Sequence, residues 1–262
     1  EKNDHGQWVG GPMYAIKNGL GRKWKWLGTL FALFGGLAGF GIGSMGQSNG
    51  IASAMHTAFG LENWVTGVAL AVMTGAVVLG GITRIGAVAE KLVPAMCVAY
   101  VICVLYVLGV YVDRIPAAFA LIFEQAFSPT AATGGFLGST VLMAIRMGVA
   151  RGIFSNEAGL GTAGIAQAAG ATRDPVFSGL VGMMGTFIDT IIVCTMTGLA
   201  IVVSGVWHSG ATGAVLSTQS FEAAMPGIGK YVPAVCLSVF AFTPILGWAY
   251  YGEKCWTYLV GT

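Results

Sequence analysis

The chain has 262 residues, of which 55% are hydrophobic and only 9% are charged, and its formal net charge is +2 at pH 7. Soluble domains carry roughly 25% charged residues, so this composition excludes an ordinary soluble globule and predicts an all-α integral membrane protein. The small net charge and the lack of a long basic tract exclude nucleic acid as a partner.

Six stretches are long and apolar enough to cross a bilayer core, which takes about 20 residues per helix. They cover residues 26–58, 64–81, 93–112, 138–169, 176–206 and 232–259. We therefore expect a single transmembrane domain over residues 1–262, beginning with a polar segment at 1–25. Residues 113–137 form the expected loop on the opposite side, in which 115–127 is typical of an amphipathic interfacial helix.

The distribution of Lys and Arg predicts the orientation of the chain. Nine of the 13 basic residues lie in the segments that alternation places with the N-terminus, two lie in the segments on the other side, and two lie within the fourth span. Because positive charge accumulates on the cytoplasmic side, we expect residues 1–25 to be cytoplasmic and 113–137 to be extracellular, in a plasma or inner membrane.

The fourth span contains the most informative stretch of the sequence, residues 150–161. Arg151, Ser155, Asn156 and Glu157 stand there beside three glycines, between apolar and small residues on both sides. A helix interrupted at membrane depth survives only where the break is buried in protein or lines a watery cavity, and transporters use such breaks as binding sites. The stretch therefore predicts an unwound segment that binds a solute.

Ionisable residues within spans are expensive, at roughly 3 kcal/mol each on insertion scales, and there are four of them: Arg146, Arg151, Glu157 and Asp189. One interpretation is that they form internal ion pairs between the fourth and fifth spans. The other is that Glu157 or Asp189 shapes an ion or substrate path.

Two further spans carry polar candidates. In the first span, Gln47 is followed by Ser48 and Asn49, whose amides and hydroxyl suit a zwitterionic solute or an interhelical hydrogen bond. In the last span, Pro244 removes a backbone donor and frees a carbonyl beside Thr243, which predicts either a sodium site or an ordinary kink.

Aromatic residues of the last span divide into two groups by depth. Trp248 lies deep enough to wall a pocket, whereas Tyr250, Tyr251 and Trp256 are expected to be interfacial. The five cysteines lie singly in apolar segments and are expected to be small buried hydrophobes. No catalytic motif is present in the sequence, so we do not expect an enzyme.

Several motifs resemble those of the alanine or glycine:cation symporter family, and they occur in the family's order over nearly the whole chain. They are residues 10–16 with 19–21, 46–49, 150–161, 187–190 with 194–195, and 242–253. The resemblance implies a LeuT-type fold of two inverted repeats, of which the six spans would be the third to eighth helices.

The same resemblance implies sodium-driven uptake of alanine or glycine by alternating access, with sodium as the coupling ion and no other cofactor. Carried over residue by residue, it implies substrate contacts from Gln47, Phe154, Ser155, Asn156 and Trp248, and a sodium ligand at Thr243. Family members commonly carry a second hydroxyl residue where this chain has Pro244.

Glu1 is not an initiator, and Thr262 follows an apolar helix directly, so we expect a fragment that lacks the first two helices and does not transport alone. Three alternatives stay open for the whole protein. They are a proton-coupled amino acid permease, a channel, and a membrane fragment without transport activity. The choice among alanine, glycine and serine stays open as well.

Overall fold

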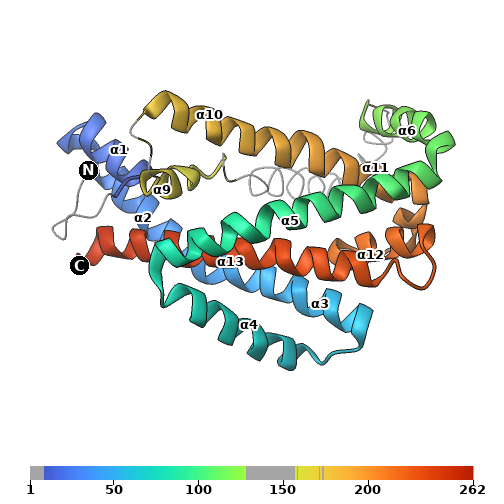
Figure 1. The fold of residues 1–262 in the computed structure, drawn as a ribbon. Helices are drawn as coiled ribbons and strands as arrows, with labels where there is room; N and C mark the ends of the chain where they lie inside the picture. The colour runs from blue at the N-terminus through green and yellow to red at the C-terminus, as the bar shows by residue number, and fades with distance from the viewer. Residues whose placement is uncertain (1–8, 128–156, 158, 171, 173, 262) are drawn as a thin grey trace, which may run out of the picture.

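The computed structural model describes residues 9–127, 157, 159–170, 172 and 174–261. Within these residues the secondary structure is entirely helical, without a strand. The long helices run roughly along one direction and α13 (Tyr231–Val260) lies among them (Figure 1). Helix α13 packs against α2 (Lys25–Phe40), α3 (Gln47–Phe59) and α5 (Gly81–Val110), and so forms the centre of the bundle.

Four helical stretches in the described part are long and apolar enough to cross a membrane: Arg22–Phe59, Gly81–Val110, Pro175–Ser204 and Tyr231–Val260. They correspond to the predicted first, third, fifth and sixth spans. The predicted second span is the shorter apolar helix α4 (Asn63–Val78), with 16 residues. The fourth span lies largely outside the described residues, so the total of six spans and the LeuT-type fold remain predictions.

Two boundaries differ from the sequence prediction. Helix α5 begins at Gly81, not near 93, so the charged stretch expected as a loop is helical. Charged residues end a hydropathy run without ending a helix. The N-terminal segment also contains helix α1 (Pro12–Gly19), which begins at a favourable Pro and buries Met13 and Tyr14. The segment is therefore part of the packed structure and not a simple polar extension.

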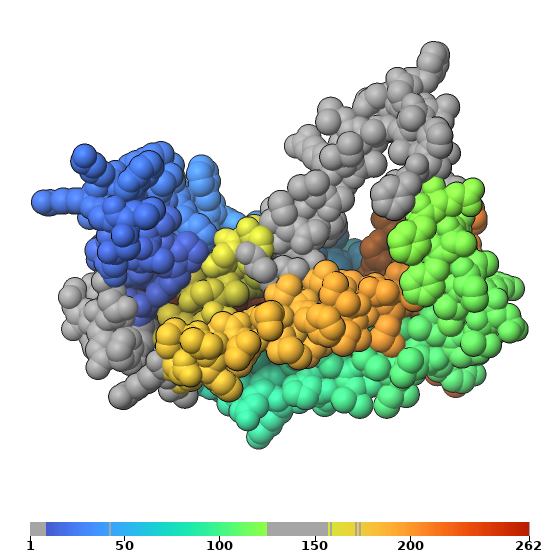
Figure 2. Space-filling view, turned by 90° about the horizontal axis from the view of Figure 1, so that it is seen from above, coloured from blue at the N-terminus to red at the C-terminus, as the bar shows by residue number. Residues whose placement is uncertain are grey.

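The predicted fifth span is one continuous helical rod made of α10 (Pro175–Thr186), the π-helical η4 (Phe187–Cys194) and α11 (Thr195–Ser204). It begins where the Asp174 carboxylate accepts hydrogen bonds from the backbone N–H groups of Val176, at 2.9 Å, and Phe177, at 3.4 Å. Seen from above, this rod and α5 run along the same side of the molecule (Figure 2). The Tyr100 and Thr197 hydroxyls join them at 2.8 Å.

The remaining described elements are short helical segments. The predicted interfacial helix is present as α6 (Ile115–Phe127), which buries Ala118 against Leu199 and Val203 of α11. The other elements are η1 (Arg22–Trp24), η2 (Gly41–Gly46), η3 (Val112–Arg114), α9 (Ala163–Ala168), η5 (Val206–Ser209) and α12 (Gly213–Ala224).

A row of glycines on α2 and η2 faces α13 at very short range. A Cβ on Gly35 would lie 2.9 Å from the Cys255 sulfur, and a Cβ on Gly39 would lie 3.3 Å from the Trp248 carbonyl oxygen. A Cβ on Gly43 would overlap the Trp248 indole. Small residues at every fourth position allow two helix backbones to approach closely in lipid, where packing replaces the hydrophobic effect as the driving force. The glycines thus set the distance between the first and last spans.

The turn before α13 is held by the carboxylate of Glu222, a half-buried residue at the protein surface. It accepts hydrogen bonds from the backbone N–H groups of Gly227, at 2.7 Å, and Lys230, at 2.8 Å. These bonds, above all the one from Gly227, together with the Lys230 charge, favour the ionised form and lower the pKa of Glu222 from its ordinary value.

We expect Gly39→Val in the full-length protein to destabilise it by about 1–3 kcal/mol, because the new side chain must push α2 away from α13. Thermal unfolding in detergent measures the effect. Gly67→Val is the matched control, since a Cβ on Gly67 of α4 meets nothing within 4 Å. Equal unfolding midpoints for the two variants would contradict the close-packing role of Gly39.

We expect the stabilisation by Glu222 to depend on pH. Its folded-state pKa lies below the unfolded value, so the contribution is complete above the unfolded pKa of about 4.5 and is lost as pH falls through the lower folded pKa. The effect is small because the carboxylate is in solvent. The unfolding midpoint of Glu222→Gln should lie below wild type at neutral pH, and the two should converge in acid. A difference independent of pH would contradict this account.

Candidate functional site

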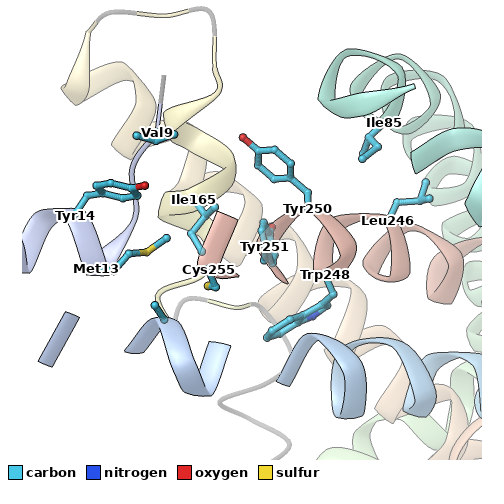
Figure 3. Close-up of a cluster of buried hydrophobic side chains, with 11 residues drawn as sticks. Val9, Met13, Tyr14, Ile85, Ile165, Leu246, Trp248, Tyr250, Tyr251 and Cys255 are labelled. Carbon is cyan, nitrogen blue, oxygen red and sulfur yellow. The ribbon is translucent and has the colours of Figure 1, made fainter. Parts of the chain in front are cut away.

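Trp248 lies at the contact between α13 and the first span. Only 3% of its surface is exposed, and its indole lies on the bare backbone of Gly43. It belongs to a buried cluster that includes Met13, Ile165 and Cys255 (Figure 3). Trp248 is therefore buried within the bundle, while its role in lining a substrate pocket stays a prediction.

Gln47 is the first residue of α3, directly after the π-helical segment η2. One turn before it, Gly43 contacts Trp248, and one turn after it, Ile51 packs with Ile245 of α13. Residues four positions apart share a helix face, so half-buried Gln47 lies between two contacts with α13. The structure thus brings the predicted pair Gln47 and Trp248 to one helix–helix interface.

The neighbours of Gln47 use their hydroxyls locally. Ser44 donates to the Gly39 carbonyl at 2.7 Å, across the wider π-helical turn, and Ser48 donates to the Ser44 carbonyl at 2.8 Å. Asn49 is exposed. Among the described residues none hydrogen-bonds the Gln47 amide, so the interhelical hydrogen bond that the sequence left open for it is not formed there.

Thr243 caps the carbonyl that Pro244 frees. Its hydroxyl donates to the Phe240 carbonyl at 3.1 Å, the group that loses its helical partner because Pro244 has no N–H. The proline does not end α13, which continues to Val260. Thr243 and Trp248 are five positions apart, or about 140° around the helix, so the predicted sodium ligand and the predicted pocket wall lie on different faces of α13.

The chain is not helical at the described end of the predicted break. Glu157 has a positive φ of 59°, rare for a residue with a side chain, and its carbonyl accepts hydrogen bonds from the N–H groups of Leu160, at 3.1 Å, and Gly161, at 2.9 Å. Gly161 itself has a φ of 75°, a conformation that glycine adopts without strain. Only after this turn does the six-residue helix α9 begin. The described end of the predicted break is therefore non-helical and a helix follows it up to Ala168, whereas residues 138–156 of the predicted span lie outside the described residues.

The Glu157 carboxylate joins this turn to α13. It accepts a hydrogen bond from the buried Thr162 hydroxyl at 3.2 Å, and the Tyr251 phenol lies beside it. The Tyr251 ring in turn packs edge-on against Trp248, with 5.7 Å between ring centroids and an interplanar angle of 72°. A continuous set of contacts thus runs from Gly43 through Trp248 and Tyr251 to Glu157.

This arrangement corrects the prediction for two aromatic residues. Tyr250 and Tyr251 are only 5% and 8% exposed, so they are core residues and not interfacial anchors, whereas Trp256 is 37% exposed. Hydropathy alone placed both tyrosines at the membrane surface. Their neighbour Lys254 is also inside α13, where it is buried and paired with Glu253 at 2.8 Å, so it is not one of the loop cations that set the orientation.

The other candidate residues are distributed as follows. Phe154, Ser155 and Asn156, together with Arg146 and Arg151, lie outside the described residues, so the predicted ion pairs and substrate contacts of that stretch stay predictions. Asp189 is half-buried in η4, where the Thr190 hydroxyl donates to it at 3.4 Å.

All five cysteines are free; two are buried, while Cys194 is exposed and so departs from the expected burial. No group of three His, Cys, Asp or Glu side chains in the described part could hold a metal ion.

Sequence comparison identifies the family to which the chain belongs. A family profile described as the sodium:alanine symporter family matches residues 1–262. The chain belongs to the sodium:alanine symporter family. It is thus similar to multi-pass membrane transporters that couple an amino acid to a cation, and the motif resemblance seen in the sequence is confirmed.

Three curated relatives show the breadth of this family. The chain is 46% identical to the sodium/alanine symporter AgcS of Methanococcus maripaludis over 99% of its own length and 58% of the relative's. It is 36% identical to a putative sodium/proton-dependent alanine carrier protein of Bacillus subtilis, covering 97% of the chain and 54% of the relative. It is also 36% identical to a probable sodium/glutamine symporter of the same organism, covering 93% and 50%. The chain spans between half and three fifths of the relatives it matches.

Proposed function

We propose that the full-length protein is a sodium-coupled symporter that imports a small neutral amino acid, alanine or glycine, by alternating access. The observation that carries the proposal is the contact between Trp248 and Tyr251, which continues to the non-helical turn at Glu157. The turn lies outside the helices, and Glu157 within it lies beside Tyr251 of the same helix that meets Gln47. Family membership supplies the class of activity.

The substrate site is proposed where the first span, the break and α13 meet. The amide of Gln47 both donates and accepts, which suits a substrate with an ammonium and a carboxylate. Backbone N–H groups at a helix start after the break carry partial positive charge and suit the carboxylate. Asn156, Ser155 and Phe154, which precede Glu157 in sequence, complete the proposed substrate contacts together with Trp248.

Sodium is proposed to bind as co-substrate at Thr243. The described donors fit a hard cation, because the Thr243 hydroxyl and the Phe240 carbonyl are neutral oxygens that each retain a free lone pair. Sodium that binds one conformation better shifts the population toward it and raises the affinity for the substrate by the same coupling free energy. One relative is named as a putative sodium/proton-dependent alanine carrier, so the identity of the coupling ion has to be tested by experiment.

We expect the full-length protein in proteoliposomes to take up labelled alanine with saturation and only with an inward sodium gradient. Gln47→Ala and Asn156→Ala should each lower uptake at least tenfold, since each removes polar contacts with a charged substrate. Asn63→Ala is the matched control, because this amide lies exposed at the start of α4. Uptake driven by a proton gradient without sodium would contradict sodium coupling, and unchanged uptake by both variants would contradict the site.

We expect Thr243→Val to raise the sodium concentration for half-maximal uptake about tenfold, whereas Thr243→Ser, which keeps the hydroxyl, should stay near wild type. The loss of one of several oxygen ligands weakens sodium binding but leaves alanine binding intact, so the alanine KM at saturating sodium should change little. Uptake measured over a sodium titration checks both values. Equal sodium dependence in the valine and serine variants would exclude Thr243 as a ligand.

A further inference from the structure

The corner between α1 and α2 exposes cations and indoles together. Arg22 and Lys23 lie in η1, Lys25 begins α2, and all three side chains are exposed. Trp24 and Trp26, which alternate with them, are 48% and 54% exposed. We name residues 22–26 the basic corner. The blue N-terminal segment that contains it stands at one end of the molecule (Figure 2).

The positive charge of the basic corner is not neutralised within the described part of the protein. Residues 5–61 contain no Asp or Glu. None of Arg22, Lys23 and Lys25 forms an ion pair with another described residue. The corner therefore carries three exposed cations that are available to an anionic partner.

The basic corner lies at the start of a lipid-facing stripe. Exposed apolar side chains recur along one face of α2 at helical spacing, and they are Trp26, Leu30, Leu33 and Leu37. Helix α2 belongs to the stretch Arg22–Phe59, which is long and apolar enough to cross a membrane, so this stripe faces acyl chains. Tryptophan is enriched at the level of the lipid headgroups. Arg22 and Lys23, which directly precede Trp24, are therefore at the depth of the lipid phosphates.

We propose that the basic corner binds an anionic phospholipid, whose phosphate accepts hydrogen bonds from Arg22 and Lys23 and whose acyl chains lie along the stripe of α2. A guanidinium donates two parallel hydrogen bonds to a phosphate, and basic residues next to a span attract anionic headgroups. A soluble acidic protein would match the charge as well. It would not account for the exposed indoles or for the leucines that continue from them into the bilayer.

A lipid bound at this corner would act on a packed part of the protein. A Cβ on Gly28 of α2 would lie 2.8 Å from the Met13 carbonyl oxygen, so α1 lies directly on α2. The Tyr14 ring of α1 packs edge-on against Tyr258 of α13, with 5.1 Å between ring centroids. Restraining the corner therefore restrains the contact of α1 with both spans, and anionic lipid should raise the unfolding midpoint.

The test is lipid binding to the full-length protein in detergent, measured by native mass spectrometry with dioleoylphosphatidylglycerol and dioleoylphosphatidylcholine. The wild type should bind phosphatidylglycerol more tightly. Arg22→Gln/Lys23→Gln should raise the apparent Kd for phosphatidylglycerol at least about tenfold, since each cation near an anionic headgroup contributes about fivefold, and it should leave the Kd for phosphatidylcholine near wild type. Equal wild-type affinity for the two lipids would overturn the proposal.

A charge-matched control separates a site from the overall charge of the protein. Arg84→Gln/Lys91→Gln removes the same two residue types from exposed positions of α5. These positions lie toward the same end of the bundle, because Ile85 belongs to the buried cluster that contains Met13. The control should bind phosphatidylglycerol like the wild type. A loss as large as that of Arg22→Gln/Lys23→Gln would overturn the basic corner as the binding site.

Two further measurements separate lipid from a soluble partner and binding from folding. Glycerophosphoglycerol, the same headgroup without acyl chains, should not compete at lipid concentrations, and equal binding would overturn a lipid occupant. Phosphatidylglycerol should raise the unfolding midpoint of the wild type but not of Arg22→Gln/Lys23→Gln, while the two proteins unfold alike without lipid because both side chains are exposed. A variant that is already less stable without lipid would overturn this assignment. None of these measurements requires transport, so they do not depend on the proposed function.

Discussion

The close approach of the first and last spans is the constraint on which the rest of this structure depends. If Gly39 and Gly43 carried Cβ atoms, the backbone and indole of Trp248 could not lie against the first span. Lipid supplies no hydrophobic force between helices, so such packing holds the bundle together. Once Trp248 is fixed there, the neighbouring turn of α13 carries Tyr251 to the side of Glu157.

The irregular backbone of this protein occurs next to its polar residues. The π-helical segment η2 ends immediately before Gln47, η4 contains Asp189, and the turn within the predicted break contains Glu157. π-helical turns inside α-helices are frequently found at functional sites, and a protein departs from local structural preferences mainly where its function requires it. The three irregular segments lie on three different spans, so a ligand bound among them would sense the relative position of those spans.

Most of the helices were predictable from hydropathy and length, because a bilayer fixes both. The start of α5 was not, since charged residues at a membrane surface continue a helix as readily as a loop. Gln47 and Trp248 were predictable as polar and aromatic residues deep in apolar spans. The burial of Tyr251 was not, because it depends on which face of α13 meets the first span, and that is set by the distant glycine row. The spacing of Gly35, Gly39 and Gly43 carried that information in the sequence.

The way Trp248 is held connects helix packing with substrate size in the proposed transporter. Its indole is fixed on one side by the bare backbone of Gly43 and at its edge by Tyr251. A wall held from two directions cannot retreat from a larger side chain unless α13 separates from the first span or Tyr251 leaves Glu157. Either movement disrupts contacts that stabilise the bundle. A preference for small amino acids would therefore follow from the same packing that gives the protein its stability.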